Sequence, residues 1–256
     1  MKEYQLRNSN IVLRYHDLPG KDVPIIFIHG LGCASSFDYP QIASMSSLGR
    51  HRRILVDLLG SGFSDKPEQF NYSIDGHAEY LAEFISHFDF DAFVIYGHSM
   101  GGAVSIALAS RCCEGLQALI LSEANLDAGG GFFSKRIASY SEQEYLQFGH
   151  DEIIQACQKE NNKNWAASLS MTYPMAVYRE SKSLLAGQSP SWREMFYGLE
   201  TVKTYIFGNS SLPDPDLEIL AGHNINIEIV PDAEHSMAWE NPEGLAIAIS
   251  TAIPVT

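Results

Sequence analysis

Ser99 lies in the stretch GHSMGG, residues 97–102, where an apolar run ends and a small-residue helical pattern begins. A Gly-x-Ser-x-Gly turn between a strand and a helix is the setting of a nucleophilic serine. The glycines leave room for neighbouring backbone, and the helix directs its N-terminal amides at any negative charge that develops there. The pattern alone also fits a turn in which the serine is incidental. Its setting favours a nucleophile.

A serine hydroxyl needs a general base to become a useful nucleophile. Of the nine histidines, His235 follows the last apolar run and precedes the last helical pattern. That position is at the carboxyl edge of an α/β sheet, where catalytic groups gather. We therefore predict that His235 is the base. His29 and His98 flank glycines in turns and are expected to orient loops. The others are expected to be surface or structural residues: His16, His51, His77, His87, His150 and His223.

These residues have to be positioned by strands and helices that alternate along the chain. Seven short apolar runs recur along the chain, at 10–18, 23–30, 52–60, 92–99, 116–125, 203–210 and 225–235, and the central ones are nearly continuous in Val, Ile, Leu and Phe. Such nearly continuous runs are typical of strands buried on both faces of a parallel sheet. Helical periodicity is clear over 72–88, 100–112 and 241–251. The pattern predicts an α/β fold with a mostly parallel sheet.

One interval, 124–200, has helix-like pieces and no convincing strand. Residues 141–149 and 151–160 each open with a capping residue followed by glutamate, which predicts two helices. We interpret 124–200 as a helical lid inserted into a core domain of residues 1–123 and 201–256. The glycine-rich stretch 127–133 is a candidate hinge, or a loose loop.

Apolar side chains of this interval are candidates for a substrate pocket or for the lid's own small core. They are Phe132, Phe133, Trp165, Met171, Tyr173, Met175, Trp192 and Phe196. We expect substrate contacts from Phe132, Phe133, Trp192, Phe196 and, in the histidine loop, Met237.

Composition limits the possible partners. The net charge of −14, with no basic block, argues against stable binding to nucleic acid or to an anionic membrane. No stretch has the length of a transmembrane helix, and the polar start does not resemble a signal peptide.

The four cysteines include no Cys-x-x-Cys pair, so we expect a reducing, cytoplasmic setting. No Cys–His cluster or dinucleotide-binding pattern is present, so we expect neither a metal nor another cofactor.

Four motifs together resemble the α/β-hydrolase family over nearly the whole chain: HGLG at 29–32, DLLGSGFSDKP at 57–67, GHSMGG, and EHSMAWENPE at 234–243. The resemblance implies a mostly parallel eight-stranded sheet flanked by helices, with a helical lid after the sixth strand. It also implies an oxyanion hole made by the backbone amides of Leu31 and Met100. Asp57 is expected to brace loops.

The resemblance also implies a catalytic triad, in which an acidic residue pairs with the histidine that activates the serine. The position of this acid departs from the family's commonest pattern. Most members place an aspartate shortly after the seventh strand, where this chain has Ser211, with Asp214 three residues later. A minority place the acid at the end of the sixth strand, where this chain has Glu123. We predict Glu123 as the acid and keep Asp214 as the second choice. Asp232 and Glu234 are expected to point elsewhere.

The leading hypothesis is a serine carboxylic ester hydrolase that acts on small to medium apolar esters through an acyl-enzyme on Ser99. A carbon–carbon bond or enol-lactone hydrolase with the same triad is the alternative within enzymes. A third possibility is a small-molecule receptor, which repeated turnover would exclude. Serine at position 99 sets the chain apart from haloalkane dehalogenases and epoxide hydrolases of this fold, which use an aspartate nucleophile. The sequence does not indicate the oligomeric state.

Overall fold

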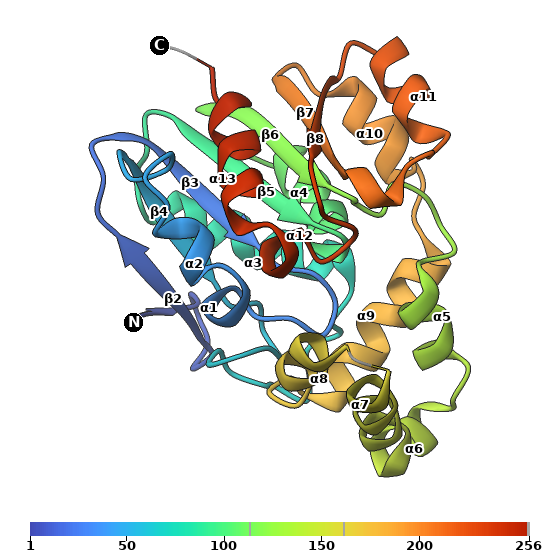
Figure 1. The fold of residues 1–256 in the computed structure, drawn as a ribbon. Coiled ribbons are helices and arrows are strands. Elements are labelled where there is room, and N and C mark those ends of the chain that lie inside the picture. The colour runs from blue at the N-terminus through green and yellow to red at the C-terminus, as the bar shows by residue number, and fades with distance from the viewer. Residues whose placement is uncertain (113, 161, 255–256) are drawn as a thin grey trace.

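A computed structural model describes residues 1–112, 114–160 and 162–254, so Cys113 lies outside the described residues. Its centre is one eight-stranded sheet in the order β1-β2-β4-β3-β5-β6-β7-β8 (Figure 1). The strand β2 pairs antiparallel with β1 and β4, and the remaining pairs are parallel. The predicted mostly parallel sheet is confirmed. The strands are β1 Lys2–Gln5, β2 Val12–Leu18, β3 Asp22–Ile28, β4 His51–Val56, β5 Phe93–His98, β6 Leu116–Ser122, β7 Val202–Gly208 and β8 Asn226–Val230.

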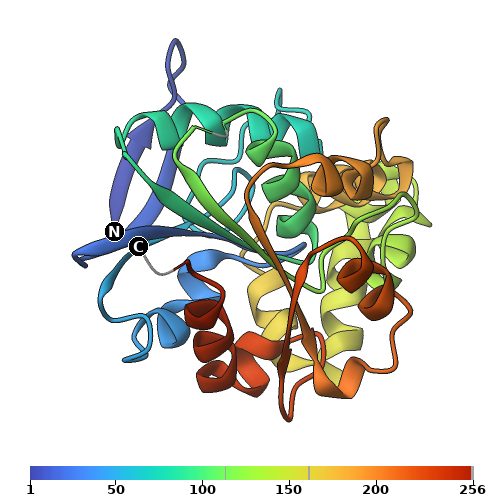
Figure 2. The same cartoon turned by 90° about the horizontal axis from the view of Figure 1, so that it is seen from above.

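Helices cover both faces of this sheet (Figure 2). Successive side chains of a strand point to opposite faces, so the strands divide their apolar residues between two cores. In β5, Ile95 packs in the core under α3 and α4, while Tyr96 packs in the core under α2 and α13. The helices outside the insertion are α1 Ser35–Asp38, α2 Pro40–Ala43, α3 Ile74–Ser86, α4 Met100–Ala109, α11 Asp216–Gly222, α12 Met237–Glu240 and α13 Pro242–Thr251.

A helical insertion follows β6, as predicted, and the chain returns to the sheet at β7. The described residues between the two strands contain no strand. In Figure 1 most of this insertion lies to one side of the sheet, in green to gold. Its elements are α5 Phe132–Ala138, α6 Glu142–Glu144, the π-helical turn Tyr145–Gly149 (η1), α7 His150–Lys159, α8 Lys163–Leu169, α9 Pro174–Ala186 and α10 Trp192–Gly198. No helix in the described part of the chain is long and apolar enough to cross a membrane.

The two helices predicted at 141–149 and 151–160 are one continuous helical segment. Ser141 caps its start in a capping box with Glu144. Gly149 keeps helical backbone angles, so Asp151 lies within the first turn of α7 and caps nothing. A π-helical turn joins the two parts, and the buried Tyr145 hydroxyl lies 2.9 Å from His150 Nδ1 across the join. The second predicted cap is therefore wrong.

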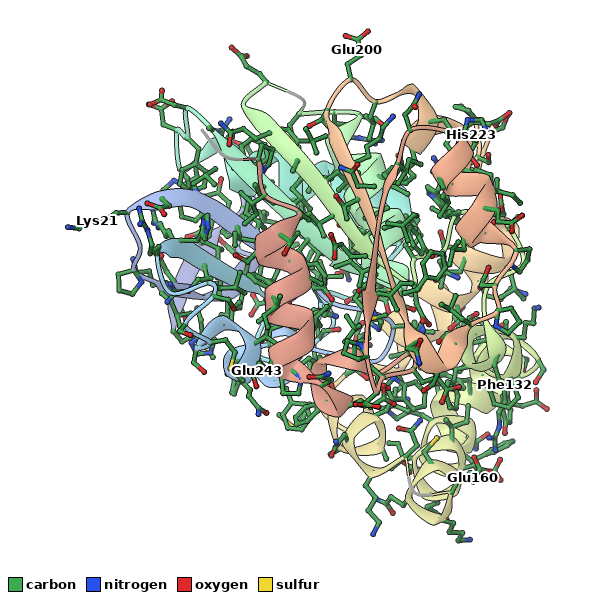
Figure 3. The ribbon with its side chains drawn as sticks, turned by 45° about the horizontal axis from the view of Figure 1, so that its top comes forward. Lys21, Phe132, Glu160, Glu200, His223 and Glu243 are labelled. Atoms are coloured by element: carbon green, nitrogen blue, oxygen red, sulfur yellow. The ribbon has the colours of Figure 1, made fainter. Side chains whose placement is uncertain are left out.

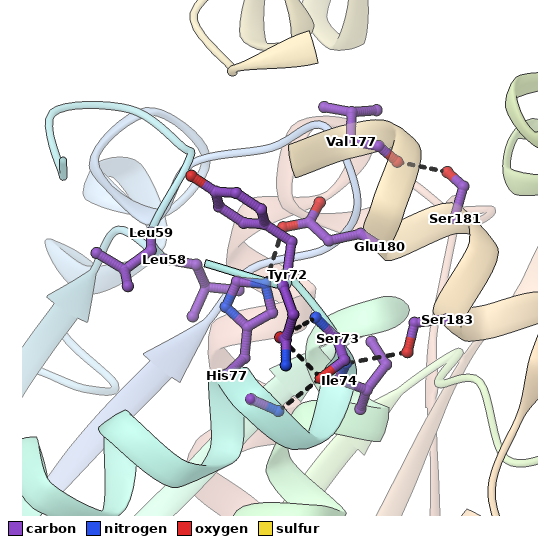
Figure 4. A network of polar contacts seen from close by, with 12 residues as sticks. Leu58, Leu59, Tyr72, Ser73, Ile74, His77, Val177, Glu180, Ser181 and Ser183 are labelled. Carbon is purple, nitrogen blue, oxygen red and sulfur yellow. Dashed lines mark hydrogen bonds and ion pairs between the residues drawn. The ribbon is translucent and has the colours of Figure 1, made fainter. Parts of the chain in front are cut away.

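A buried polar network attaches α9 of the insertion to α3 of the core (Figure 4). Glu180 Oε1 lies 3.0 Å from His77 Nε2, and both side chains are buried. The Tyr80 oxygen accepts the Leu59 amide at 3.0 Å, so its own proton can go to His77 Nδ1 at 2.7 Å. His77 Nε2–H is then the donor to Glu180. A buried contact between α9 and α3 therefore holds the insertion on the core.

Candidate active site

Ser99 adopts a backbone conformation that is rare for a residue with a side chain. Its φ of 53° and ψ of −120° lie outside the regions that L-residues prefer. The surroundings hold it there. Its amide donates to the Ser122 carbonyl at 3.0 Å, and its carbonyl accepts from the amides of Gly102 at 2.9 Å and Asn125 at 3.2 Å. Ser99 is therefore fixed at the junction of β5, β6 and α4.

All three glycines of GHSMGG are required by close packing, and a Cβ atom on Gly102 would collide with Ala124 Cβ. A Cβ atom on Gly97 would collide with the Ser105 side chain and lie 2.6 Å from the Gly101 carbonyl oxygen. A Cβ atom on Gly101 would collide with the carbonyl oxygens of Ile28 and His29. Here the spacing that marks the motif in the sequence is a steric requirement of the strand–turn–helix junction.

Three side chains predicted from the sequence form one chain of contacts. His235 Nε2 lies 3.2 Å from Ser99 Oγ, and His235 Nδ1 lies 2.9 Å from Glu123 Oε2. Ser99 follows β5, Glu123 follows β6, and His235 follows β8. The imidazole is about half exposed, whereas the Glu123 side chain is 14% exposed.

Donors surround the Glu123 carboxylate on its other side. Gly208 N donates to Oε1 at 3.1 Å, and the Ser211 hydroxyl also hydrogen-bonds to the carboxylate. Burial by itself raises the pKa of Glu123, but the hydrogen bonds from His235, Ser211 and Gly208 hold it below its usual value. The residue at the family's commonest acid position, Ser211, thus supports a carboxylate that comes from the neighbouring strand.

Asp214, the second choice for the acid, is engaged elsewhere. Its Oδ1 accepts the Asp216 amide at 2.7 Å, at the start of α11. Asp232 is exposed, and Glu234 donates its amide to Glu240 Oε2 at 2.7 Å. Of these carboxylates, Glu123 is the one that the structure brings to His235.

His29 orients the first of the two amides expected in the oxyanion hole. His29 Nε2 accepts the Leu58 amide at 3.0 Å, so the proton is on Nδ1, which donates to the Gly30 carbonyl at 2.9 Å. A trans peptide is planar, with its C=O and N–H pointing in opposite directions. Fixing the Gly30 carbonyl therefore fixes the direction of the Leu31 N–H.

The second amide is that of Met100, the first residue of α4, which has no acceptor inside its own helix. Neither the Leu31 nor the Met100 amide donates to another group in the described part of the chain. The turn after β3 approaches the serine closely, because a Cβ on Gly30 would lie 3.3 Å from Ser99 Cβ. Both amides are thus available beside Ser99.

Asp57, expected to brace loops, accepts three hydrogen bonds. They come from the Ser36 amide at 2.8 Å, the Ser36 hydroxyl at 2.7 Å and the Phe63 amide at 3.0 Å. The buried carboxylate joins α1, which follows β3, to the loop after β4.

A cavity of about 500 Å³ opens onto Ser99 and His235. The turn at Leu31 and the aromatic side chains of Phe132, Phe133 and Trp165 line it, and Asn125, Asn162 and Ser134 add polar groups. No Lys or Arg stands among the described residues of its wall. Figure 3 labels Phe132, which is 71% exposed, at the outside of the insertion.

Among the described residues, no group of three or more His, Cys, Asp or Glu side chains is placed to bind a metal ion.

Three residues expected to contact substrate lie in the hydrophobic cores instead. Trp192 and Phe196 are buried where α10 packs on α4, and Met237 is buried on the opposite face of the sheet. None of them lines the cavity. The spacing of four residues between Trp192 and Phe196 places them on one helix face, which is the signature of a packing face.

His98 has a closer relation to the site than the sequence indicated. Its ring lies 4.7 Å from that of His235, and its Nδ1 contacts Ser122. Burial, and then the proximity of His235, lowers the pKa of His98 to about 3. His98 therefore stays neutral beside the proposed base. The sequence feature that could have indicated this relation is the position of His98 directly before Ser99, at the end of a strand.

Comparisons with known proteins agree with this architecture. The family model for the alpha/beta hydrolase fold matches residues 23–197. A 2-hydroxy-6-oxo-2,4-heptadienoate hydrolase from Pseudomonas putida is 31% identical over 117 residues, 45% of this chain and 42% of the relative. Haloalkane dehalogenase 2 from Mycobacterium bovis is 33% identical over 102 residues, 40% of this chain and 35% of the relative.

Each of these matches spans less than half of the relative's own length. Among solved structures, an esterase from Exiguobacterium antarcticum superposes with a TM-score of 0.80 at 16% identity, covering 97% of each chain. Because the family model covers more than half of the chain, the chain belongs to the α/β-hydrolase fold family.

Proposed function

We propose that this protein is a serine hydrolase that cleaves small to medium apolar carboxylic esters through an acyl-enzyme on Ser99. The observation that carries the proposal is the unbroken chain of contacts from Ser99 through His235 to Glu123, opening onto a cavity of about 500 Å³. A nucleophile within hydrogen-bond reach of a base, itself oriented by a third group, is the arrangement that covalent catalysis needs.

The reaction follows from the positions of these groups. Ser99 Oγ attacks the ester carbonyl carbon while His235 Nε2 takes its proton. The carbonyl oxygen becomes negative, and the Leu31 and Met100 amides stabilise it. The tetrahedral intermediate then expels the alcohol, which takes the proton from His235. Water repeats the sequence on the acyl-enzyme, releasing the acid and restoring Ser99.

Glu123 has two tasks in this scheme. Its Oε2 accepts the proton of His235 Nδ1, which leaves Nε2 free to act as the base. Its negative charge stabilises the imidazolium that forms during attack. The hydrogen bonds that hold the pKa of Glu123 below its usual value keep it ionised for both tasks.

The cavity wall supports an uncharged substrate. Phe132, Phe133 and Trp165 offer aromatic surface for an acyl or alcohol group. The ionisable side chains of the wall include Glu123 and Glu234 but neither Lys nor Arg, within the residues described. A substrate carboxylate would find no cation to pair with there.

A carbon–carbon bond or enol-lactone hydrolase is the second candidate, because one relative is named for hydrolysis of 2-hydroxy-6-oxo-2,4-heptadienoate. The same serine chemistry fits such a substrate. A dienoate, however, is an anion, and the wall described above favours a neutral ester. We also propose that residues 124–200 form a lid, since Phe132, Phe133 and Trp165 of this insertion wall the cavity.

The test is a panel of p-nitrophenyl esters of increasing acyl length, with 2-hydroxy-6-oxo-2,4-heptadienoate measured alongside. We expect turnover of the esters, little turnover of the dienoate, and loss of ester hydrolysis in Ser99→Ala. Ser110→Ala, at the far end of α4, is the matched serine control and should hydrolyse like the wild type. Faster turnover of the dienoate than of every ester would replace the ester proposal by the second candidate.

A further inference from the structure

The insertion contacts the oxyanion turn through one side chain. Trp165 of α8 donates its indole N–H to the Leu31 carbonyl at 2.9 Å, across 134 residues of sequence. The Leu31 carbonyl belongs to the peptide that follows the proposed oxyanion amide. This hydrogen bond therefore restrains the turn on the side that His29 does not hold.

The rest of α8 lies against the same turn. Gly32 has a φ of +67°, and a Cβ there would lie 2.8 Å from Leu169 Cδ1 and 3.1 Å from Trp165 Cζ2. Backbone this close to two side chains of the insertion leaves no space between α8 and the turn. The glycine meets both the conformational and the steric requirement.

A third contact fixes the ring itself. Trp165 stacks on Phe133 of α5, with ring centroids 4.1 Å apart and an interplanar angle of 29°. Both rings line the cavity beside Ser99. The indole is thus held between two elements of the insertion and one turn of the core.

From these contacts we propose that Trp165 is a positioning residue, which holds the Leu31 amide in the orientation that binds the oxyanion when α8 is seated on the core. Two neighbouring carbonyls of the turn are then fixed from different sides. The core holds Gly30 through His29, and the insertion holds Leu31 through Trp165. The inference rests on the proposed function, because it concerns the rate of the same reaction.

Trp165→Phe tests the hydrogen bond directly, since it removes the indole N–H and keeps an aromatic ring against Phe133. Loss of a direct oxyanion donor costs about 10²–10³ in kcat. Loss of a group that only positions the donor should cost less, and we expect kcat to fall about 5- to 50-fold with KM within about twofold of the wild type. Affinity for a boronic acid that forms a tetrahedral adduct on Ser99 should fall by the same factor as kcat.

Trp192→Phe is the matched control in the same insertion. Trp192 is buried, and its indole N–H has no partner in the described part of the chain, so the substitution removes no hydrogen bond. We expect a lower Tm with kcat unchanged. Hydrogen–deuterium exchange of residues 29–33 should quicken in Trp165→Phe and stay at the wild-type rate in Trp192→Phe, a difference that a general loss of stability would not produce.

The outcomes separate this inference from the proposed function. A wild-type protein without Ser99-dependent hydrolysis overturns the proposed function, and the inference with it. An active wild type whose kcat, boronic acid affinity and exchange at 29–33 are all unaltered by Trp165→Phe overturns the inference alone.

Discussion

Glu123 Oε2 lies 2.9 Å from His235 Nδ1, although the two residues are 112 positions apart and belong to loops after different strands. The strands β6 and β7 are neighbours in the sheet, and β8 follows β7. A carboxylate at the end of β6 can therefore reach a histidine after β8 by extending past the end of β7, where Gly208 donates to it.

This relationship predicts the effect of neutralising the acid. Glu123→Gln can no longer select the productive tautomer of His235 or stabilise the imidazolium. The comparable change to the triad aspartate of a serine protease costs about 10⁴ in kcat. We expect a loss of that order for hydrolysis of a p-nitrophenyl ester. Asp214→Asn is the matched control and should change kcat less than about threefold, and a larger loss there than in Glu123→Gln would transfer the role to Asp214.

Ser99 and His235 should act as one unit. Once either side chain is gone, the other has no partner for its step, so Ser99→Ala combined with His235→Ala should cost little more than either change alone. Steady-state kinetics of the three variants measures this. Losses that multiply would mean that the two side chains act independently.

Two phenylalanines of the insertion should separate specificity from stability. Phe133 lines the cavity, so Phe133→Ala should shift the preferred acyl length of p-nitrophenyl esters toward longer chains. Phe196 is buried in the core, so Phe196→Ala should lower the free energy of unfolding by about 3–5 kcal/mol and leave the preference unchanged. Urea unfolding and the ester panel check both. The reverse assignment of effects would contradict the placement of the two rings.

Acid stability should depend on Asp17 of β2, whose carboxylate pairs with Arg52 and Lys2 and is 6% exposed. The hydrogen bonds from Arg52, opposed by burial and aided by Lys2, lower the pKa of Asp17 from 3.8 to about 2. A carboxyl whose pKa is lower in the folded chain stabilises the fold above its unfolded pKa, and this contribution disappears as the pH falls through the folded pKa.

The stabilisation from Asp17 should therefore be full above about pH 4 and be lost between about pH 4 and pH 2. Its size is about 1–2 kcal/mol, after a discount for solvent screening. At pH 6, the Tm of Asp17→Asn should be lower than that of the wild type. At pH 2, where most of the stabilisation from Asp17 is lost in the wild type, the two Tm values should be close. Glu218→Gln, at an exposed position of α11, is the control. An equal Tm difference at both pH values would show that the loss is not electrostatic.

The sequence predicted those features that depend on local spacing. Val94–Tyr96 followed by GHSMGG specified a strand, a turn and a helix, because each apolar residue and each glycine has a steric reason to be there. The strand β1 was missed because Lys2–Gln5 is polar and lies at the edge of the sheet, with one buried side chain, Tyr4.

The sequence could not decide which aromatic side chains face the cavity. Phe133 and Phe196 have the same side chain and both lie in short helices of the insertion. Their environments differ because α10 packs on α4, whereas α5 borders the cavity. Likewise, the hydrogen bond from Trp165 to Leu31 joins residues 134 positions apart, and no periodic pattern carries that information.

Labelling with a fluorophosphonate tests whether Ser99 is the nucleophile, on which the proposed reaction depends. Phosphonylation forms a bond between Ser99 Oγ and phosphorus and expels fluoride, so it requires the activated serine and stops before turnover. Peptide mass spectrometry after labelling should find one phosphonyl group per chain, on Ser99, and ester hydrolysis should fall in proportion to the label. A label on another residue, or full hydrolysis by completely labelled protein, would contradict the assignment of Ser99.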